Sequence, residues 1–262
     1  MDESGLDNEG KAYTSCKEMW QAELGEKGEK RETWYSKAVE YWEKSEPTYN
    51  GVMGGFEKVS PLDVRDSKKF LKRHLKHLLE QKEHDGRKLR VLDCGAGVGR
   101  VSQELLLEFF DTVDLVEPVG KLLDTAKVNL AQAVESGRYP DGHAAGEFFV
   151  KGLQELELEP ESYDVIWLQW AMLYLTDDDA KAFFEKSLAA LRPRGRIFVK
   201  ENTCEVGFVV DKDDSSLTRS RPYMEQLFKQ AGAVQLGSAR QTGFPEQLFE
   251  VQMYCLARPG NI

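Results

Sequence analysis

The chain has 262 residues, of which 41% are hydrophobic and 10% aromatic, and its formal net charge at pH 7 is −10. This composition suffices for a full hydrophobic core, in one large domain or two small ones. The acidic balance is opposite to that of proteins that bind nucleic-acid phosphates, so we expect no nucleic-acid partner. No apolar run approaches the roughly 20 residues of a membrane span, so we expect no membrane association either.

The first residues of the chain and its cysteines indicate in which cellular compartment the protein is located. Residues 1–13 lack a basic region and an apolar core, so they do not resemble a signal peptide. Cys16, Cys94, Cys204 and Cys255 show no CxxC spacing, which favours reduced thiols over a disulfide framework or a zinc site. We therefore expect no metal site and a cytoplasmic or nuclear location.

The first 58 residues divide into a polar part and an aromatic part. Residues 1–30 are dense in Glu, Lys and Gly, which predicts a loosely ordered extension with a short helix at 19–24. Trp34, Ala38, Tyr41 and Trp42 recur at helical spacing and predict a helix over 34–44. The glycine-rich stretch 47–56 predicts a flexible loop. The folded domain is expected to span 31–262 and to begin with this helix and loop at 31–58.

The rest of the chain alternates between predicted strands and helices. An amphipathic helix over 60–81 comes first. The predicted strands are 89–93, 112–117, 147–152, 163–170 and 195–202, and the predicted helices are 98–110, 119–135 and 177–191. After a last helix, 221–232, the strands 234–241 and 247–258 predict an antiparallel hairpin that closes one edge. This order predicts an α/β fold that is doubly wound around a mostly parallel, seven-stranded sheet.

The segment "DCGAGVGR", which ends the first of these strands, predicts a ligand site at the carboxyl end of the sheet. Its glycines at 95, 97 and 99 match neither the GxxxxGK[ST] pattern of a phosphate loop nor the GxGxxG pattern of a dinucleotide site. What remains is a turn of small residues in which a ligand can lie against the backbone. Asp93 stands at its entrance.

A second acidic residue restricts the kinds of ligand that the turn could bind. Glu117 ends the second strand, 24 residues after Asp93, close to the spacing of about 20 at which an acid accepts both ribose hydroxyls. A glycine turn without a phosphate site, together with a ribose acid, predicts S-adenosylmethionine (SAM). Arg100 would pair with the SAM carboxylate, and Leu153 and Gln154 would flank the adenine. The alternative, that the glycines serve only close helix–strand packing, leaves Glu117 and Arg100 unexplained.

A more specific resemblance is carried by the stretches "YW…PTYNGVMGG", "LDCGAGVGR", "GLQ", "YDVIWLQW", "LRPRGRIFVKEN" and "DKDDSS". From residue 34 to residue 258, the chain resembles the eukaryotic protein N-terminal methyltransferases that act on Xaa-Pro-Lys or Xaa-Pro-Arg amino termini. The resemblance implies a Rossmann-like class I SAM-dependent methyltransferase with an N-terminal helical lid. It also implies SAM as cofactor, S-adenosylhomocysteine as its product, and protein substrates with free amino termini.

The resemblance and the loop argument together imply two sets of residues. Those expected at SAM are Asp93, Gly95, Gly97, Arg100, Glu117, Leu153, Gln154 and Gln169. Those expected at the peptide are Trp42, Val52, Met53, Trp170, Asn202, Asp211, Asp214, Ser216, Leu248 and Phe249. Trp170 would line the slot for the first two residues, and Asn202 would bond the peptide backbone. Asp211 and Asp214 would receive the third-residue cation and the terminal amine.

The chemistry of the acceptor supports this interpretation. A free α-amino group has a pKa of about 7.7–8.0, so a sizeable neutral fraction exists at physiological pH. A nearby carboxylate needs to accept only one proton while the site orients the amine and excludes water. We expect Asp214 in that role. The alternative for "DKDD" is a solvated acidic turn.

Two positions depart from the family pattern and leave alternatives open. Tyr174 stands where the family commonly has a histidine, and a tyrosine with a pKa of about 10 is a poor base at neutral pH. Either Asp214 carries the proton alone, or Tyr174 orients the amine or a water. Phe249 replaces a tyrosine that bonds the peptide. Two other functions remain open: a small-molecule methyltransferase on the same fold, and a non-catalytic module that binds SAM or basic amino termini.

Overall fold

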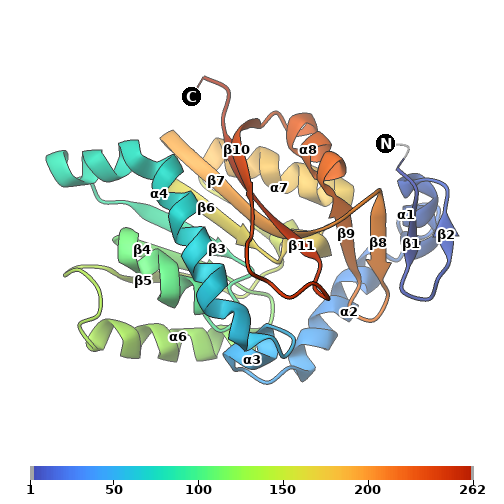
Figure 1. Ribbon diagram of the computed structural model, residues 1–262, viewed down its shortest axis with the longest axis horizontal. Helices are drawn as coiled ribbons and strands as arrows, with labels where there is room; N and C mark the ends of the chain where they lie inside the picture. Colours follow the sequence, from blue (N-terminus) through green and yellow to red (C-terminus); the bar gives the residue numbers. More distant parts are fainter. Residues whose placement is uncertain (1–2, 261–262) are drawn as a thin grey trace.

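A mostly parallel sheet runs through the middle of the protein, as the computed structural model shows for residues 3–260 (Figure 1). Seven of its strands lie in the order β5-β4-β3-β6-β7-β11-β10, and among these only β11 runs in the direction opposite to the other six. Their bounds are β3 Arg90–Cys94, β4 Thr112–Val116, β5 Ala144–Phe149, β6 Tyr163–Gln169, β7 Leu191–Cys204, β10 Val234–Arg240 and β11 Glu250–Ala257. The predicted mostly parallel sheet and its C-terminal antiparallel hairpin are confirmed, but within residues 3–260 the sheet has eleven strands where seven were expected, because four strands described below extend it.

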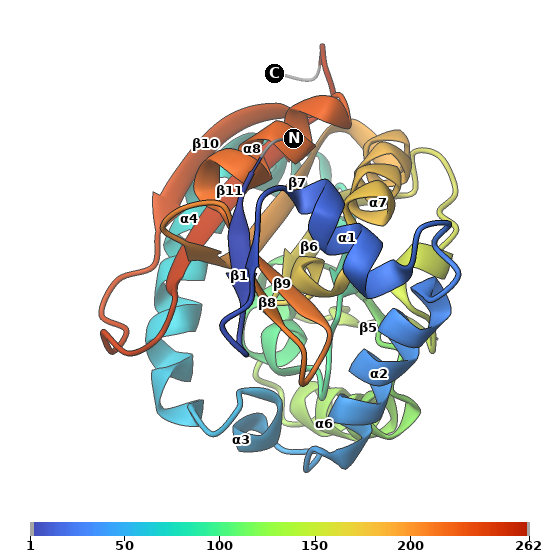
Figure 2. The ribbon, with the colours of Figure 1, turned by 90° about the vertical axis from the view of Figure 1, so that its right-hand side faces the viewer.

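Helices cover both faces of this sheet (Figure 2). They are α1 Cys16–Leu24, α2 Arg31–Lys44, α3 Tyr49–Val52, α4 Ser60–Asp85, α5 Leu107–Phe109, α6 Gly120–Glu135, α7 Asp177–Ala190 and α8 Arg221–Gln230, with the short turns η1 Glu57–Val59, η2 Ser102–Leu106, η3 Leu153–Glu155 and η4 Met172–Tyr174. Within residues 3–260, no helix combines the length and the apolarity that crossing a membrane requires.

Two apolar layers hold the helices to the sheet. In β6, Val165 and Trp167 belong to one cluster of buried side chains, while Ile166 and Leu168 belong to the other. This division follows from the alternation of side chains along a strand. The first cluster packs against α4, α5 and α6, and the second packs against α1, α2, α7 and α8. The layers position the carboxyl ends of β3, β4 and β6 side by side.

The N-terminal part of the chain is ordered, contrary to the predicted extension. Residues 3–30 contain the hairpin of β1 (Gly5–Asp7) and β2 (Ala12–Tyr13), followed by α1. Tyr13, Cys16 and Met19 are buried in the core. The prediction of loose order was wrong because these apolar residues are few and are separated by charged ones. Each of them nevertheless reaches the core, and β1 is held by backbone pairing, which leaves no apolar pattern in the sequence.

A second hairpin, absent from the predicted elements, lies beside β1 (Figure 2). It consists of β8 (Phe208–Asp211) and β9 (Ser216–Ser220), and the "DKDD" stretch includes its turn. β1 pairs in parallel with β8, and β9 pairs in parallel with the end of β7. The acidic stretch is therefore fixed between strands.

Several predicted boundaries shift. The stretch 47–56, expected as a flexible loop, contains α3, where the Thr48 hydroxyl accepts a hydrogen bond from Gly51 N at 3.0 Å. The helix expected at 98–110 includes a π-helical turn, η2, before α5. The strand expected at 147–152 is β5, which ends earlier, at Phe149. The helix expected at 60–81 continues to Asp85, and Gly86 ends it in a left-handed conformation.

Candidate active site

A cavity of ≈ 310 Å³ opens where the carboxyl ends of β3, β4 and β6 meet the lid formed by α2 and α3. Every residue predicted for SAM lines it: Asp93, Gly95, Gly97, Arg100, Glu117, Leu153, Gln154 and Gln169. From the residues expected at the peptide, the structure brings Trp42, Val52, Met53 and Trp170 to the same cavity, and Tyr174 lines it as well. The individual roles of these residues stay predictions.

The glycine turn is shaped by close contacts. Gly95 and Gly97 have φ values of 71° and 55°, in the left-handed region that favours glycine. A Cβ atom at Gly95 would lie 2.4 Å from the Cβ of Ala171, so only glycine fits there. The backbone amide of Gly97 donates to Glu117 Oε2 at 2.9 Å, and that of Val119 donates to Oε1 at 3.0 Å. Glu117 thus ties the turn to the end of β4. Each of its oxygens has a second lone pair available for a hydroxyl group.

The two acids in the cavity are poorly solvated. Burial raises the pKa of Glu117 to about 7, against the opposing hydrogen bonds from Val119 and Gly97. Burial also raises the pKa of Asp93 to about 6, although the Ser102 hydroxyl donates to its Oδ2 at 2.6 Å. The ionised form of such a buried carboxyl group is stabilised most by a ligand that carries positive charge or donates hydrogen bonds. A sulfonium donor with ribose hydroxyls has both properties, so these residues fit SAM.

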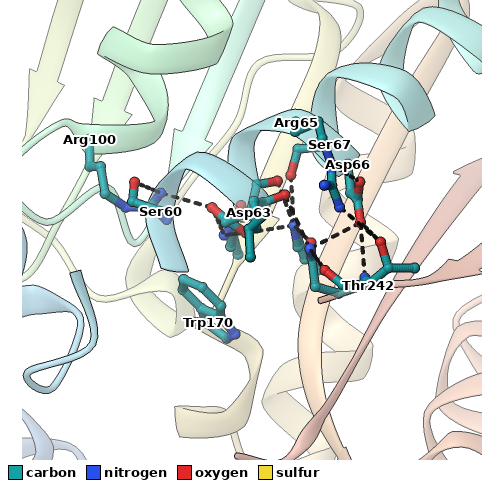
Figure 3. Close-up of polar contacts among 12 residues, drawn as sticks. Ser60, Asp63, Arg65, Asp66, Ser67, Arg100, Trp170 and Thr242 are labelled. Carbon is teal, nitrogen blue, oxygen red and sulfur yellow. Dashed lines mark hydrogen bonds and ion pairs between the residues drawn. The ribbon is translucent and has the colours of Figure 1, made fainter. Parts of the chain in front are cut away.

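A buried polar cluster around Asp63 includes two residues that line the cavity, Arg100 and Gln169 (Figure 3). Asp63, on the first turn of α4, lies 2.8 Å from Arg100 Nη1 and 2.5 Å from Lys200 Nζ, and it accepts Gln169 Nε2 at 2.9 Å. Burial alone would raise the pKa of Asp63, but the charges of Lys200 and Arg100 lower it below its usual value. Asp63 therefore orients two of the residues predicted for SAM.

Asp63 was not among the residues expected at the site, and no protein partner was expected for Arg100. Arg100 is 4% exposed; besides Asp63, it donates to Ser60 Oγ at 3.1 Å. Its guanidinium also lies 5.5 Å from the centre of the Trp170 ring. The only signal in the sequence was an acid in the first turn of a helix, and that is an ordinary feature of helix starts.

On the acceptor side, Tyr174 connects the lid to residues 211–214, the acidic turn between β8 and β9. Its hydroxyl accepts a hydrogen bond from Trp42 Nε1 at 2.8 Å and donates one to Asp214 Oδ2 at 3.2 Å. Burial, and then the charge of Asp214, raises the pKa of Tyr174 well above its usual value, so this residue stays protonated. Tyr174 is placed to orient Asp214 and is unsuited to accept a proton.

Asp214 has the environment of a proton acceptor. Its Oδ1 atom is buried and makes no hydrogen bond within residues 3–260. Burial raises the pKa of Asp214 above its usual value, with Asp211 adding to the rise and Ser216 opposing it. A raised pKa brings a carboxylate closer to the pKa of an amine, which favours proton transfer between them. Burial, and then the charges of Asp214, Asp211 and Asp213, also raise the pKa of Tyr41 on α2.

The other predicted acceptor residues divide into two groups. Asn202 accepts a hydrogen bond from Trp170 Nε1 at 3.1 Å, and Trp170 has a φ of 50°, which is rare for an aromatic residue and marks local strain. Asp211 pairs with Ser216 across the hairpin. Leu248 and Phe249 precede β11, and Phe249 is 46% exposed. Like Asn202, Asp211, Asp214 and Ser216, they are not among the residues that line the cavity. The roles expected of these residues at the peptide therefore stay predictions.

The strand order, the glycine turn and the acid at the end of β4 define a class I SAM-dependent methyltransferase. A family model described as AdoMet dependent proline di-methyltransferase matches residues 30–257. The chain belongs to this family.

Individual relatives agree with the family match. The chain is 44% identical to alpha N-terminal protein methyltransferase 1 of Arabidopsis thaliana, over 98% of this chain and 91% of the relative. It is 38% identical to N-terminal Xaa-Pro-Lys N-methyltransferase 1-B of Xenopus laevis, over 79% and 87%. A solved SAM-dependent methyltransferase from Leishmania major superposes with a TM-score of 0.83 at 38% identity, covering 98% of this chain and 96% of the other. This last likeness includes the N-terminal part that the sequence reasoning misjudged.

Proposed function

We propose that the protein transfers the methyl group of SAM to the α-amino group of protein amino termini of the Xaa-Pro-Lys or Xaa-Pro-Arg type. The observation that carries the proposal is the half-buried Asp214 carboxyl, which accepts a hydrogen bond from Tyr174, a residue that lines the cavity, while its buried Oδ1 atom is unpartnered within residues 3–260. The printed names of the relatives in Arabidopsis and Xenopus support it.

SAM, when bound, supplies a methyl group on a positively charged sulfur. The residues that would hold it are those of the glycine turn, with Asp93 and Glu117 facing its positive charge and its ribose. Arg100 and Gln169 are fixed by Asp63 and need little rearrangement when a ligand enters. Preorganised groups of this kind reduce the ordering cost of binding.

The acceptor residues have three tasks. Asp214 accepts the proton of the α-ammonium group, while Tyr174 keeps that carboxylate in position through its hydroxyl. Trp170, fixed by Asn202, presents a flat surface that suits the rigid ring of a second-position proline. Asp211 and Asp214 give the turn a negative charge that suits a third-position Lys or Arg. Because Trp42 contacts Tyr174, closure of the lid and alignment of the acid are linked.

A panel of hexapeptides tests the proposal. We expect label from SAM to appear on a peptide that begins Ser-Pro-Lys and not on its N-acetylated form, because acetylation removes the nucleophilic amine. Label on both peptides would indicate a different acceptor atom. No label on either peptide, with SAM bound, would favour a small-molecule acceptor or a non-catalytic binding module.

A further inference from the structure

The acidic turn contains a cation of its own. Lys212 lies between Asp211 and Asp213, two residues before Asp214. A lysine side chain is a mobile point charge on a four-carbon stem, and it pairs with carboxylates within reach. If its ammonium group lay among the acids of the turn, it would compete with the third-residue Lys or Arg of a peptide for the same negative charge.

The structure places this ammonium group elsewhere. Lys212 Nζ lies 2.8 Å from Asp7 Oδ2 and 3.2 Å from Glu9 Oε2, and both acids belong to the N-terminal segment. Asp7 is 1% exposed, and its carboxylate also accepts the Tyr13 hydroxyl at 3.0 Å and the backbone amide of Lys11 at 2.8 Å. The hydrogen bond from Lys212 is the main reason why the pKa of Asp7 falls to about 2. Asp7 thus stays ionised and remains a permanent partner for this lysine at physiological pH.

A second contact from the same segment orients the turn. Asn8 Nδ2 donates to Asp211 Oδ1 at 2.8 Å, and Asn8 Oδ1 accepts the backbone amide of Lys212 at 3.2 Å. The backbone amide of Asn8 donates to Val210 O at 2.9 Å, which continues the pairing of β1 with β8. One side chain therefore holds both the carboxylate and the backbone of the turn.

The segment is docked by close backbone contact. A Cβ atom at Gly5 would lie 2.3 Å from Phe208 O, and one at Gly207 would lie 1.7 Å from Ser4 O. Glycine is thus required on both sides of the contact between β1 and β8. Together with the buried Asp7, this shows that β1 is an integral part of the sheet beside the acidic turn.

We propose that the N-terminal hairpin, β1 and β2, is a specificity element of the acceptor site. By holding the Lys212 ammonium group at Asp7 and Glu9, the hairpin keeps that group away from the acids that receive the third-residue cation of the peptide. By orienting Asp211 through Asn8, it presents one of those acids in a fixed position. This inference rests on the proposed function and adds that the N-terminal hairpin takes part in substrate selection.

Steady-state kinetics with two peptides test the inference. The peptides are Ser-Pro-Lys and Ser-Pro-norleucine hexapeptides, which differ in the charge at position three. The enzymes are the wild type, the double variant Asp7→Asn/Glu9→Gln, and the triple variant that adds Lys212→Met. Glu185→Gln serves as a matched control, because it removes an exposed acid paired with a lysine on α7.

In the double variant, Lys212 is released and turns toward the acidic turn. We expect the KM for the lysine peptide to rise about tenfold, with kcat and the KM for the norleucine peptide unchanged. The triple variant restores the KM because the competing cation is gone, and a purely structural role for the hairpin would not produce this rescue. The control variant behaves as the wild type.

Two results would overturn the inference: an unchanged preference for lysine in the double variant, or a triple variant as impaired as the double one. Should the double variant fail to fold, the single variant Glu9→Gln replaces it in the test. The Glu9 side chain is 70% exposed, so this substitution is not expected to disturb folding. It is expected to raise the KM about twofold, and no rise would then count against the inference. A wild type that methylates neither peptide refutes the proposed function itself, whereas an active wild type with unresponsive variants refutes only the inference.

Discussion

The cofactor side and the acceptor side of the cavity are built in different ways. On the cofactor side, the turn after β3 and Glu117 after β4 lie at the ends of neighbouring strands. On the acceptor side, Trp42, Tyr174 and Asp214 come from three distant segments, and their hydrogen bonds exist only in the folded chain. A nucleotide-like ligand can thus be inferred from local sequence patterns, while the acceptor depends on tertiary contacts. Each of the following experiments is designed to affect one side more than the other.

The largest effect is expected on the cofactor side, from Asp63→Ala. The substitution leaves Arg100 and Lys200 buried without their carboxylate, and breaking a buried ion pair costs about 3–5 kcal/mol of unfolding free energy. Denaturant unfolding measures this loss. Asp85→Ala, at the exposed end of α4, is the control. A variant as stable as the wild type would show that Asp63 does not hold the cluster together.

On the acceptor side, Asp214→Asn is expected to lower kcat about 10³-fold, because the amide cannot accept the proton of the ammonium group. The affinity for SAM should not change, since Asp214 lies outside the cofactor residues. Single-turnover kinetics and calorimetry together measure both quantities. Equal loss of SAM affinity would contradict the separation of the two sides, and undiminished kcat would remove Asp214 as the proton acceptor.

Glu117→Ala is the reciprocal test for the cofactor side. It removes a carboxylate that holds the glycine turn and is expected to accept ribose hydroxyls, so affinity for S-adenosylhomocysteine should fall about 100-fold. Titration calorimetry measures the dissociation constant, with Glu147→Ala on the exposed side of β5 as the control. An affinity equal to that of the wild type, in a folded protein, would exclude Glu117 from the site.

The smallest effect is the pH dependence of SAM binding. Burial raises the pKa of Glu117 to about 7 in the free protein, and a ligand that prefers the ionised carboxylate must release its proton. The affinity should therefore fall as pH drops below 7, by at most about tenfold per pH unit, and stay level above it. Calorimetry at pH 6 in two buffers of different ionisation enthalpy measures the released proton. Glu117→Gln should abolish this release, and a release that persists would point to Asp93.

The same contrast explains how much the sequence predicted. The residues expected at SAM all line one cavity, because a motif at a strand end has its position fixed by the sheet. Asp63 escaped notice because its partners, Arg100 and Lys200, lie 37 and 137 residues away. The N-terminal hairpin escaped for the same reason, since Asn8 contacts Asp211 across 203 residues. Polar contacts over such separations leave no periodic pattern.

The position of the transferred methyl group is the most direct test of the whole account. Tandem mass spectrometry of a Ser-Pro-Lys hexapeptide, after incubation with the protein and SAM, assigns the added mass to one nitrogen. The account predicts methylation confined to the α-amine of the first residue, in wild-type protein and at a lower rate in Asp214→Asn. Methyl groups on the lysine ε-amine, with the α-amine unmodified, would contradict it.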